Sequence, residues 1–124
     1  MRGTAMTQYF VLLPSDEARY AASSDQERAD LAAAHTEFVQ LLAERGHKMT
    51  GGAQLADSSK SRTVRGAGVD QVSVTDGPYA ESTEQAGGFY TIETDDVDDL
   101  YKVCGRLTAT PFHTVIEVRP IIET

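Results

Sequence analysis

The chain has 124 residues, a length that fits one domain able to bury a core without disulfides or a structural metal. Its 19 acidic and 11 basic residues give a formal net charge of −8, which argues against direct binding of nucleic acid or an anionic membrane surface. The single cysteine, Cys104, excludes an internal disulfide, and neither CxxC nor HxxxH metal-ligand spacing occurs.

One domain is expected over residues 8–123, with residues 1–7 as a disordered lead-in. No apolar run reaches the roughly 18 residues of a membrane helix, and the start lacks the apolar core of a signal peptide. We therefore expect a cytoplasmic protein with no membrane partner.

The first strand is expected over residues 8–14, "QYFVLLP", a short apolar run that ends at Pro14. Such a run is typical of a central strand that is buried on both faces. Residues 15–23 are polar and rich in alanine, and we expect them to form a loop or a weak turn of helix.

The strongest helix signal runs from about Asp25 to Arg45. Ser24 and Glu27 have the S-x-x-E spacing of a capping box, in which each side chain binds a free backbone N–H of the first turn. Gly46 supplies the usual stop. Residues that recur at steps of three and four positions form one stripe along this helix. The stripe consists of Leu31, Ala34, His35, Phe38, Leu41 and Leu42. Its polar member is a histidine.

The second half of the chain is predicted to be mostly strand. Residues 47–56 read as a strand with a bulge at its two glycines, and residues 63–75 as a hairpin that turns through Gly66 and Gly68. Residues 87–94 form a further strand, and residues 113–122 form the last one. Between them lies a shorter amphipathic helix over 95–107, whose inner side is expected to carry Val97, Leu100, Tyr101, Cys104 and Leu107.

This order, β-α-β-hairpin-β-α-β, is that of the α+β ferredoxin-like split βαβ fold. Its antiparallel sheet carries both helices on one face and leaves the other face bare. In the last strand, Ile116, Val118 and Ile122 fall on one side, and Val115, Glu117, Arg119 and Ile121 on the other. Because this mixed face is too apolar to stay wet, we expect a homodimer that encloses a partly polar cavity.

His35 and Asp76 are the residues best suited to chemistry. His35 is either a core histidine or a functional one, and Asp76 is either the start of an Asx turn or the partner of that histidine. Gly77 and Pro78 force a turn directly after Asp76. A carboxylate bonded to one ring nitrogen would make the other nitrogen a usable general acid or base.

The remaining polar candidates carry weaker signals. His47 and His113 lie at the ends of elements, where exposed histidines are common, and their spacing supports no metal site. Arg119 either pairs with Glu117 or clamps an anionic ligand. Cys104 is expected to be a small buried hydrophobe.

Three segments resemble the YCII-related family and its DGPF subgroup: "AAAHTEFVQLLAERGHKMTGGAQL", "VTDGPYAESTEQAGGFYTIET" and "VIEVRPI". The subgroup usually has phenylalanine where this chain has Tyr79, whose hydroxyl would either extend a polar site or face water. The resemblance implies a dimeric α+β barrel in which His35 and Asp76 form the active-site pair. It also implies small-molecule chemistry, as in related dehydrochlorinases and lactone isomerases, or an association with sigma factors.

Two functional hypotheses follow. In the first, the protein is an enzyme without a cofactor, in which Asp76 orients His35 for acid–base chemistry and Gly77, Pro78, Tyr79 and Arg119 contact a small organic substrate. In the second, it is a non-catalytic module that binds a ligand or a sigma-factor-like partner through its acidic surface. A purely structural bond between the histidine and the aspartate is the third reading.

Overall fold

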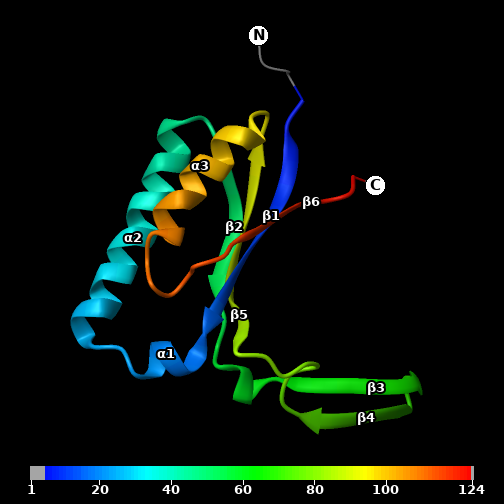
Figure 1. Ribbon diagram of the computed structural model, residues 1–124. Helices are drawn as coiled ribbons and strands as arrows, with labels where there is room; N and C mark the ends of the chain where they lie inside the picture. The colour runs from blue at the N-terminus through cyan, green and yellow to red at the C-terminus, as the bar shows by residue number, and fades with distance from the viewer. Residues whose placement is uncertain (1–4, 124) are drawn as a thin grey trace.

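The computed structural model describes residues 5–123, which form a mixed α+β fold (Figure 1). In chain order its elements are β1 (Thr7–Asp16), α1 (Glu17–Ala21), α2 (Asp25–Glu44), β2 (Lys48–Gln54), the 3-10 turn η1 (Ser58–Lys60), β3 (Arg62–Gly68), β4 (Gln71–Asp76), β5 (Glu84–Thr94), α3 (Val97–Thr108) and β6 (Glu117–Pro120). The predicted order of helices and strands is confirmed.

The main sheet has four strands in the order β2-β5-β1-β6, and every neighbouring pair is antiparallel. This is the ferredoxin-like arrangement expected from the sequence. Helices α2 and α3 cover one face of the sheet, and the other face carries no helix (Figure 1). We call this uncovered side the open face.

The capping box predicted for α2 is present. The Ser24 hydroxyl accepts a hydrogen bond from the Glu27 backbone N–H at 3.1 Å, and the Glu27 carboxylate accepts one from the Ser24 N–H at 3.0 Å. At the other end Gly46 has a φ of 80°, the left-handed conformation that favours glycine after a helix. Local sequence therefore sets both ends of this helix.

The core lies between the two long helices and the sheet. From α2 it takes Ala34, Phe38 and Leu42, which confirms the predicted stripe. Leu100, Val103, Cys104 and Leu107 supply the buried side of α3. The prediction for Tyr101 was wrong, because its side chain is 51% exposed and Val103 is buried in its stead. Val103 lies three residues after Leu100 and four before Leu107, so it continues the apolar face of the helix.

The hairpin of β3 and β4 forms its own two-stranded sheet, which projects from the body on the side of the open face (Figure 1). We call it the arm. Its turn lies at Val69 and Asp70, not at Gly66 and Gly68, which both belong to β3. A side chain at Gly66 would meet the Gln71 carbonyl oxygen at 2.0 Å, so glycine is needed there for close strand contact.

The open face is mixed, as the last strand predicted. Val118 packs toward the core, whereas Glu117 and Arg119 are exposed and form an ion pair at 3.0 Å. β6 is shorter than expected, and Ile122, placed on the inner side by strand alternation, is 85% exposed beyond its end. Alternation applies only while the chain remains a strand, and here the strand stops at Pro120.

β1 begins at Thr7, which pairs with Thr94, so the ordered strand starts one residue before the predicted domain. β1 continues through Pro14 to Asp16, with a register shift at Leu13/Pro14. The rest of the expected lead-in falls partly on residues 1–4, outside the described residues. Among residues 5–123 no helix is long and apolar enough to span a membrane.

Removing the α2 cap tests this account of the helix start. Ser24→Ala is expected to lower the free energy of unfolding by about 1 kcal/mol, because the Glu27 N–H loses its acceptor. Ser24→Asp is the matched control, since aspartate is an equally good cap and is expected to keep the wild-type stability. Urea titration followed by circular dichroism measures both variants. Equal stability of the alanine and wild-type proteins would contradict the cap's contribution.

Candidate functional site

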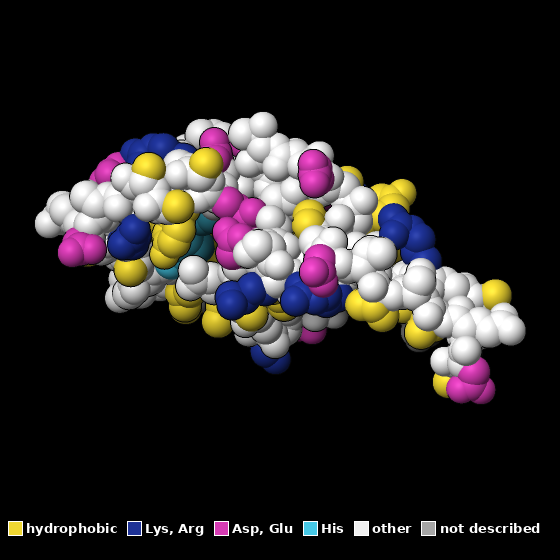
Figure 2. All heavy atoms as spheres, turned by 90° about the horizontal axis from the view of Figure 1, so that it is seen from below, with side chains coloured by type: hydrophobic (Ala, Val, Ile, Leu, Met, Phe, Trp, Pro, Cys, Tyr) yellow, Lys and Arg dark blue, Asp and Glu magenta, His cyan; other side chains and the backbone are white. Residues whose placement is uncertain are grey.

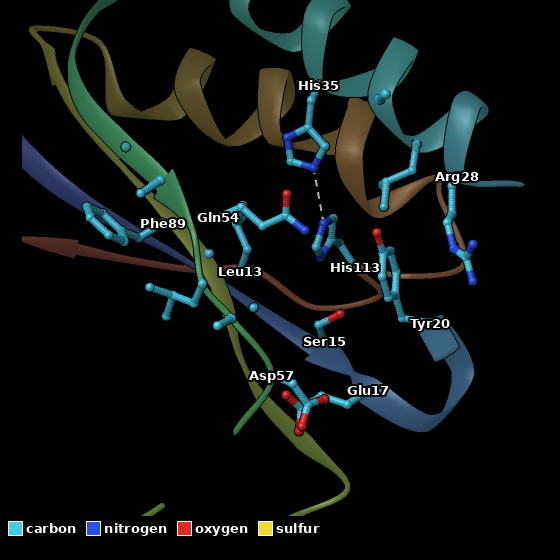
Figure 3. Close-up of a pocket in the computed structure, with 18 of the residues that line it drawn as sticks. Leu13, Ser15, Glu17, Tyr20, Arg28, His35, Gln54, Asp57, Phe89 and His113 are labelled. Atoms are coloured by element: carbon cyan, nitrogen blue, oxygen red, sulfur yellow. Dashed lines mark hydrogen bonds between the residues drawn. The ribbon is translucent and has the colours of Figure 1, made fainter. Parts of the chain in front are cut away.

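A cavity of about 830 Å³ opens between the helices α1 and α2 and the neighbouring ends of β1, β2 and β5. This volume is in the range of small-molecule sites. Leu13, Leu31 and Leu55 contribute apolar walls. Figure 2, which views the molecule from below, shows histidine atoms at the bottom of a hollow in this part of the surface. Tyr20 and Gln54 also border the cavity (Figure 3).

Three polar side chains form a hydrogen-bonded row in the wall of this cavity. The Nδ1 atom of His35 lies 2.7 Å from the hydroxyl oxygen of Tyr90, and its Nε2 atom lies 3.1 Å from Nε2 of His113. Figure 3 shows the two imidazoles facing each other, one from α2 and one from the segment after α3. The Nδ1 atom of His113 lies 3.3 Å from the carbonyl oxygen of Pro14 in β1. We call Tyr90, His35 and His113 the relay.

The Pro14 carbonyl fixes where each proton of the relay lies. A carbonyl oxygen can only accept, so Nδ1 of His113 carries a proton and, in the neutral ring, Nε2 is an acceptor. The facing Nε2 of His35 must then be the donor. This leaves Nδ1 of His35 to accept from the Tyr90 hydroxyl. The neutral relay therefore runs in one direction, from Tyr90 through His35 to His113 and the backbone.

The surroundings keep both imidazoles neutral near pH 7. Burial, together with the positive charge that His113 would carry, lowers the pKa of His35 from 6.5 to about 4. Burial also lowers the pKa of His113, although its bond to the Pro14 carbonyl opposes that shift. The pKa of Tyr90 is raised by burial. Because two imidazolium ions would repel each other across this contact, the relay can hold at most one extra proton.

Asp76 and His35 do not meet within the chain. Both ring nitrogens of His35 already have partners, and Asp76 lies at the end of β4 with a side chain that is 90% exposed. Its partner is Arg62, at 3.1 Å across the arm. The two strands of the arm form a separate sheet, so the DGP turn is not held against the main sheet as the sequence reading assumed.

The other predicted contact residues also lie away from the relay. Gly77 has a φ of 94°, which explains the glycine, and its N–H donates to the Ser61 carbonyl at 2.9 Å. Pro78 and Tyr79 border a second hollow of about 660 Å³ at the base of the arm. Arg119 lies on the open face. The predicted binding roles of these residues stay predictions.

His113 and Tyr90 are the site residues that the sequence reading missed. The expectation that His47 and His113 are exposed was wrong, since they are 4% and 6% exposed. His113 lies in the segment between α3 and β6, where its ring reaches Pro14 of β1. Tyr90 lies two residues from Gly88 and from Ile92, which are buried, so strand alternation places it on the face that α2 covers. That alternation was the one available signal.

A second buried histidine cluster is closed to any ligand. His47 lies between the Thr94 hydroxyl at 2.7 Å and Asp99 at 2.8 Å, which resembles a catalytic triad. However, Thr94 is 1% exposed, and its hydroxyl also accepts the Asp96 N–H at 2.9 Å. Bonds from His47 and Arg45 lower the pKa of Asp99. This cluster joins the residue before β2 to β5 and α3 and is structural.

Neither a nucleophilic cysteine nor a metal cluster accompanies the relay in the described part of the chain. Burial raises the pKa of the Cys104 thiol to about 11, so the thiol is protonated and inert, as expected of a core residue. Residues 5–123 contain no group of three or more His, Cys, Asp or Glu side chains arranged to hold a metal ion. The chemistry that the side chains of the relay can perform is proton transfer.

The fold and cavity define an α+β protein of ferredoxin-like topology with a histidine-lined pocket. The chain belongs to the YCII-related family, because the model of the YCII-related domain matches residues 7–124. It is also similar to an uncharacterized protein of Rhizobium meliloti (strain 1021), with 31% identity over 118 residues that cover 91% of this chain and 90% of the relative.

Acidification is expected to destabilise the protein through His35. The unfolded chain binds a proton below about pH 6.5 that the folded chain takes up only near pH 4, so this stability is present above pH 6.5 and is lost as the pH falls. Because the ring is partly exposed, the loss between about pH 7 and pH 5 is reduced to the order of 1 kcal/mol. Urea titrations at both pH values measure it.

His35→Gln is expected to flatten this pH dependence, with the remaining slope of the same sign coming in part from His113. Val11→Ala is the control, since it removes buried volume without touching a titrating group and is expected to keep the wild-type slope. Identical slopes for the wild type and His35→Gln would show that His35 titrates normally in the fold.

Proposed function

We propose that the protein is an acid–base enzyme that moves a proton on a small organic molecule held in the 830 Å³ cavity. The observation that supports this proposal is the directional row of Tyr90, His35 and His113 in the cavity wall. Apolar side chains at these three positions would serve the fold alone. The polar side chains give up part of that apolar contact and form hydrogen bonds along which a proton can pass.

In the proposed reaction, each proton that one group gives up is taken up by the next group. As the substrate gives a proton to the Tyr90 oxygen, Tyr90 passes its own hydroxyl proton to Nδ1 of His35. His35 passes its Nε2 proton to Nε2 of His113, which becomes an imidazolium held by the Pro14 carbonyl. Reversal of these steps returns one proton to the substrate at a second position. The result is an isomerisation, or an elimination when a leaving group departs after deprotonation.

The cavity supplies the conditions that this reaction needs. The apolar side chains in its wall lower the local polarity and so strengthen electrostatic interactions inside it. The ground state of the relay is neutral, so it can accept a proton at pH 7. A negative charge that develops on the substrate favours the imidazolium and raises the pKa of the histidine pair toward neutral.

We also propose that the protein forms a homodimer through the open face and the arm. Phe10 and Phe89 stack at 5.5 Å on the open face. On the arm, Val64 and Val74 pair across the strands and are 62% and 58% exposed, and Val72 beside them is 54% exposed. Figure 2 shows apolar side chains along this projecting part. A lone two-stranded hairpin is marginal in water, so a second chain is the natural cover.

The proposed dimer interface includes the part of the arm that carries Asp76. Asp76 shares one face of the arm with Val64 and Val74, because strand side chains alternate and Asp76 is two residues beyond Val74. Any role of Asp76 in chemistry would therefore require the second chain. Association with sigma factors and a cytoplasmic location stay predictions.

Deuterium exchange tests the enzyme proposal without knowledge of the substrate. We expect the protein to speed exchange of hydrogens on carbons next to the carbonyl in some members of a panel of small ketones and lactones in D2O. His35→Gln is expected to lower that rate roughly 10²–10⁴-fold, since it removes the central base. Proton NMR measures the exchange.

Tyr90→Phe is expected to lower the exchange rate as well, because it removes the end of the relay that faces the substrate. Tyr101→Phe is its matched control, since this tyrosine is exposed on α3 and does not line the cavity. If hydrogen exchange on every compound of the panel is equally fast with the wild type and with His35→Gln, His35 has no part in catalysis.

Light scattering after size exclusion tests the dimer. Val74→Asp is expected to convert the dimer to a monomer, because it buries an unpaired charge in the proposed interface. Ser73→Asp adds the same charge on the opposite face of the arm and is expected to leave the dimer intact. A wild-type protein that is monomeric at micromolar concentration would contradict the proposal.

A further inference from the structure

We propose that the cavity selects an amphiphilic carboxylate, whose anionic head binds Arg28 and whose apolar body extends along α2 to the relay. This inference rests on the proposed function, since it names the substrate class of the same cavity. The geometry that supports it is the position of Arg28, which borders the cavity together with Tyr20 and His113 (Figure 3).

Arg28 has unused binding capacity. Its Nε atom donates no hydrogen bond among the described residues but is buried, so the terminal nitrogens are the atoms that a ligand can reach. Its ion pair with Asp25 is 3.5 Å long, and the Asp25 side chain is fully exposed, so this contact adds little. The guanidinium carbon lies 5.5 Å from the centre of the Tyr20 ring, a cation–π contact with another residue of the cavity lining. A planar guanidinium is suited to bidentate binding of a carboxylate.

Among the described residues that line the cavity, Arg28 is the only arginine or lysine. The acidic residues of the lining, Glu17 and Asp57, lie in another part of the wall and have partners. Glu17 accepts bonds from the backbone N–H and the hydroxyl of Ser58, and Asp57 accepts one from the Ser59 N–H at 3.0 Å. They repel an anion from their end of the cavity and leave the Arg28 end as its favoured position.

The helix sets the length of the ligand. Arg28 and His35 are seven residues apart, so they lie on nearly the same face of α2, about 10 Å apart along its axis. Leu31 and Ala32 line the cavity between them. A molecule that reaches from the guanidinium to the relay therefore has a carboxylate at one end, an apolar middle and a reacting carbon at the other end.

Titration calorimetry with 4-phenylbutyrate and with its neutral amide, 4-phenylbutanamide, tests the proposal. The wild-type protein is expected to bind the carboxylate at least about tenfold more tightly than the amide. Arg28→Gln is expected to weaken the carboxylate at least about tenfold and to leave the affinity for the amide unchanged, which also shows that the variant is folded. Acetate, which has no apolar body, is expected to show no saturable binding.

Arg106→Gln is the matched control. It removes the same charge from a surface ion pair with Glu37, outside the cavity lining, and is expected to bind 4-phenylbutyrate like the wild type. Binding of 4-phenylbutyrate is read from Arg28→Gln, and hydrogen exchange is read from His35→Gln. This separates failure of the ligand assignment, seen in binding, from failure of the enzyme proposal, seen in exchange.

Three results would overturn the assignment. They are an equal affinity of Arg28→Gln and wild type for 4-phenylbutyrate, equal affinities of the wild type for the acid and the amide, and no saturable binding of 4-phenylbutyrate.

Discussion

Packing of α2 against the inner face of the sheet is the constraint on which the rest of the structure depends. Phe38 and Leu42 are buried completely or almost so, and they hold the helix against β1 and β5. One turn nearer the start of the helix, the same stripe carries His35 where another apolar residue would otherwise lie. The helix that closes the core therefore also fixes the imidazole in the cavity wall.

A backbone carbonyl determines which nitrogen of this imidazole donates a hydrogen bond and which accepts one. Because Pro14 can only accept, the proton positions of His113, His35 and Tyr90 follow one from another along β1, α2 and β5. The row replaces the expected carboxylate as the group that orients His35. An imidazole partner differs from a carboxylate in one respect: it is neutral at rest, so it offers no negative charge against the burial that lowers the pKa of His35. That charge is left for the ligand to supply.

The proposed anionic substrate and the neutral relay therefore belong together. A carboxylate bound at Arg28 brings negative charge into an apolar cavity whose histidines are held neutral by burial. Such a charge favours the protonated relay and moves the pKa of the pair toward the value at which proton transfer in both directions is efficient. The arm and the open face are separate from this site, and they concern the assembly of two chains.

Local signals in the sequence determined the elements: the capping box at Ser24, the stop at Gly46 and the alternating strands give the ferredoxin-like order with small errors at the ends. They also singled out His35, the polar member of an apolar stripe. Only the tertiary structure decided its partners, because a hydrogen bond between residues 35 and 113 depends on how the segment after α3 folds back, and no short-range pattern encodes that path. For the same reason Asp76, conspicuous in the sequence, lies on an arm beside Arg62 rather than next to the histidine.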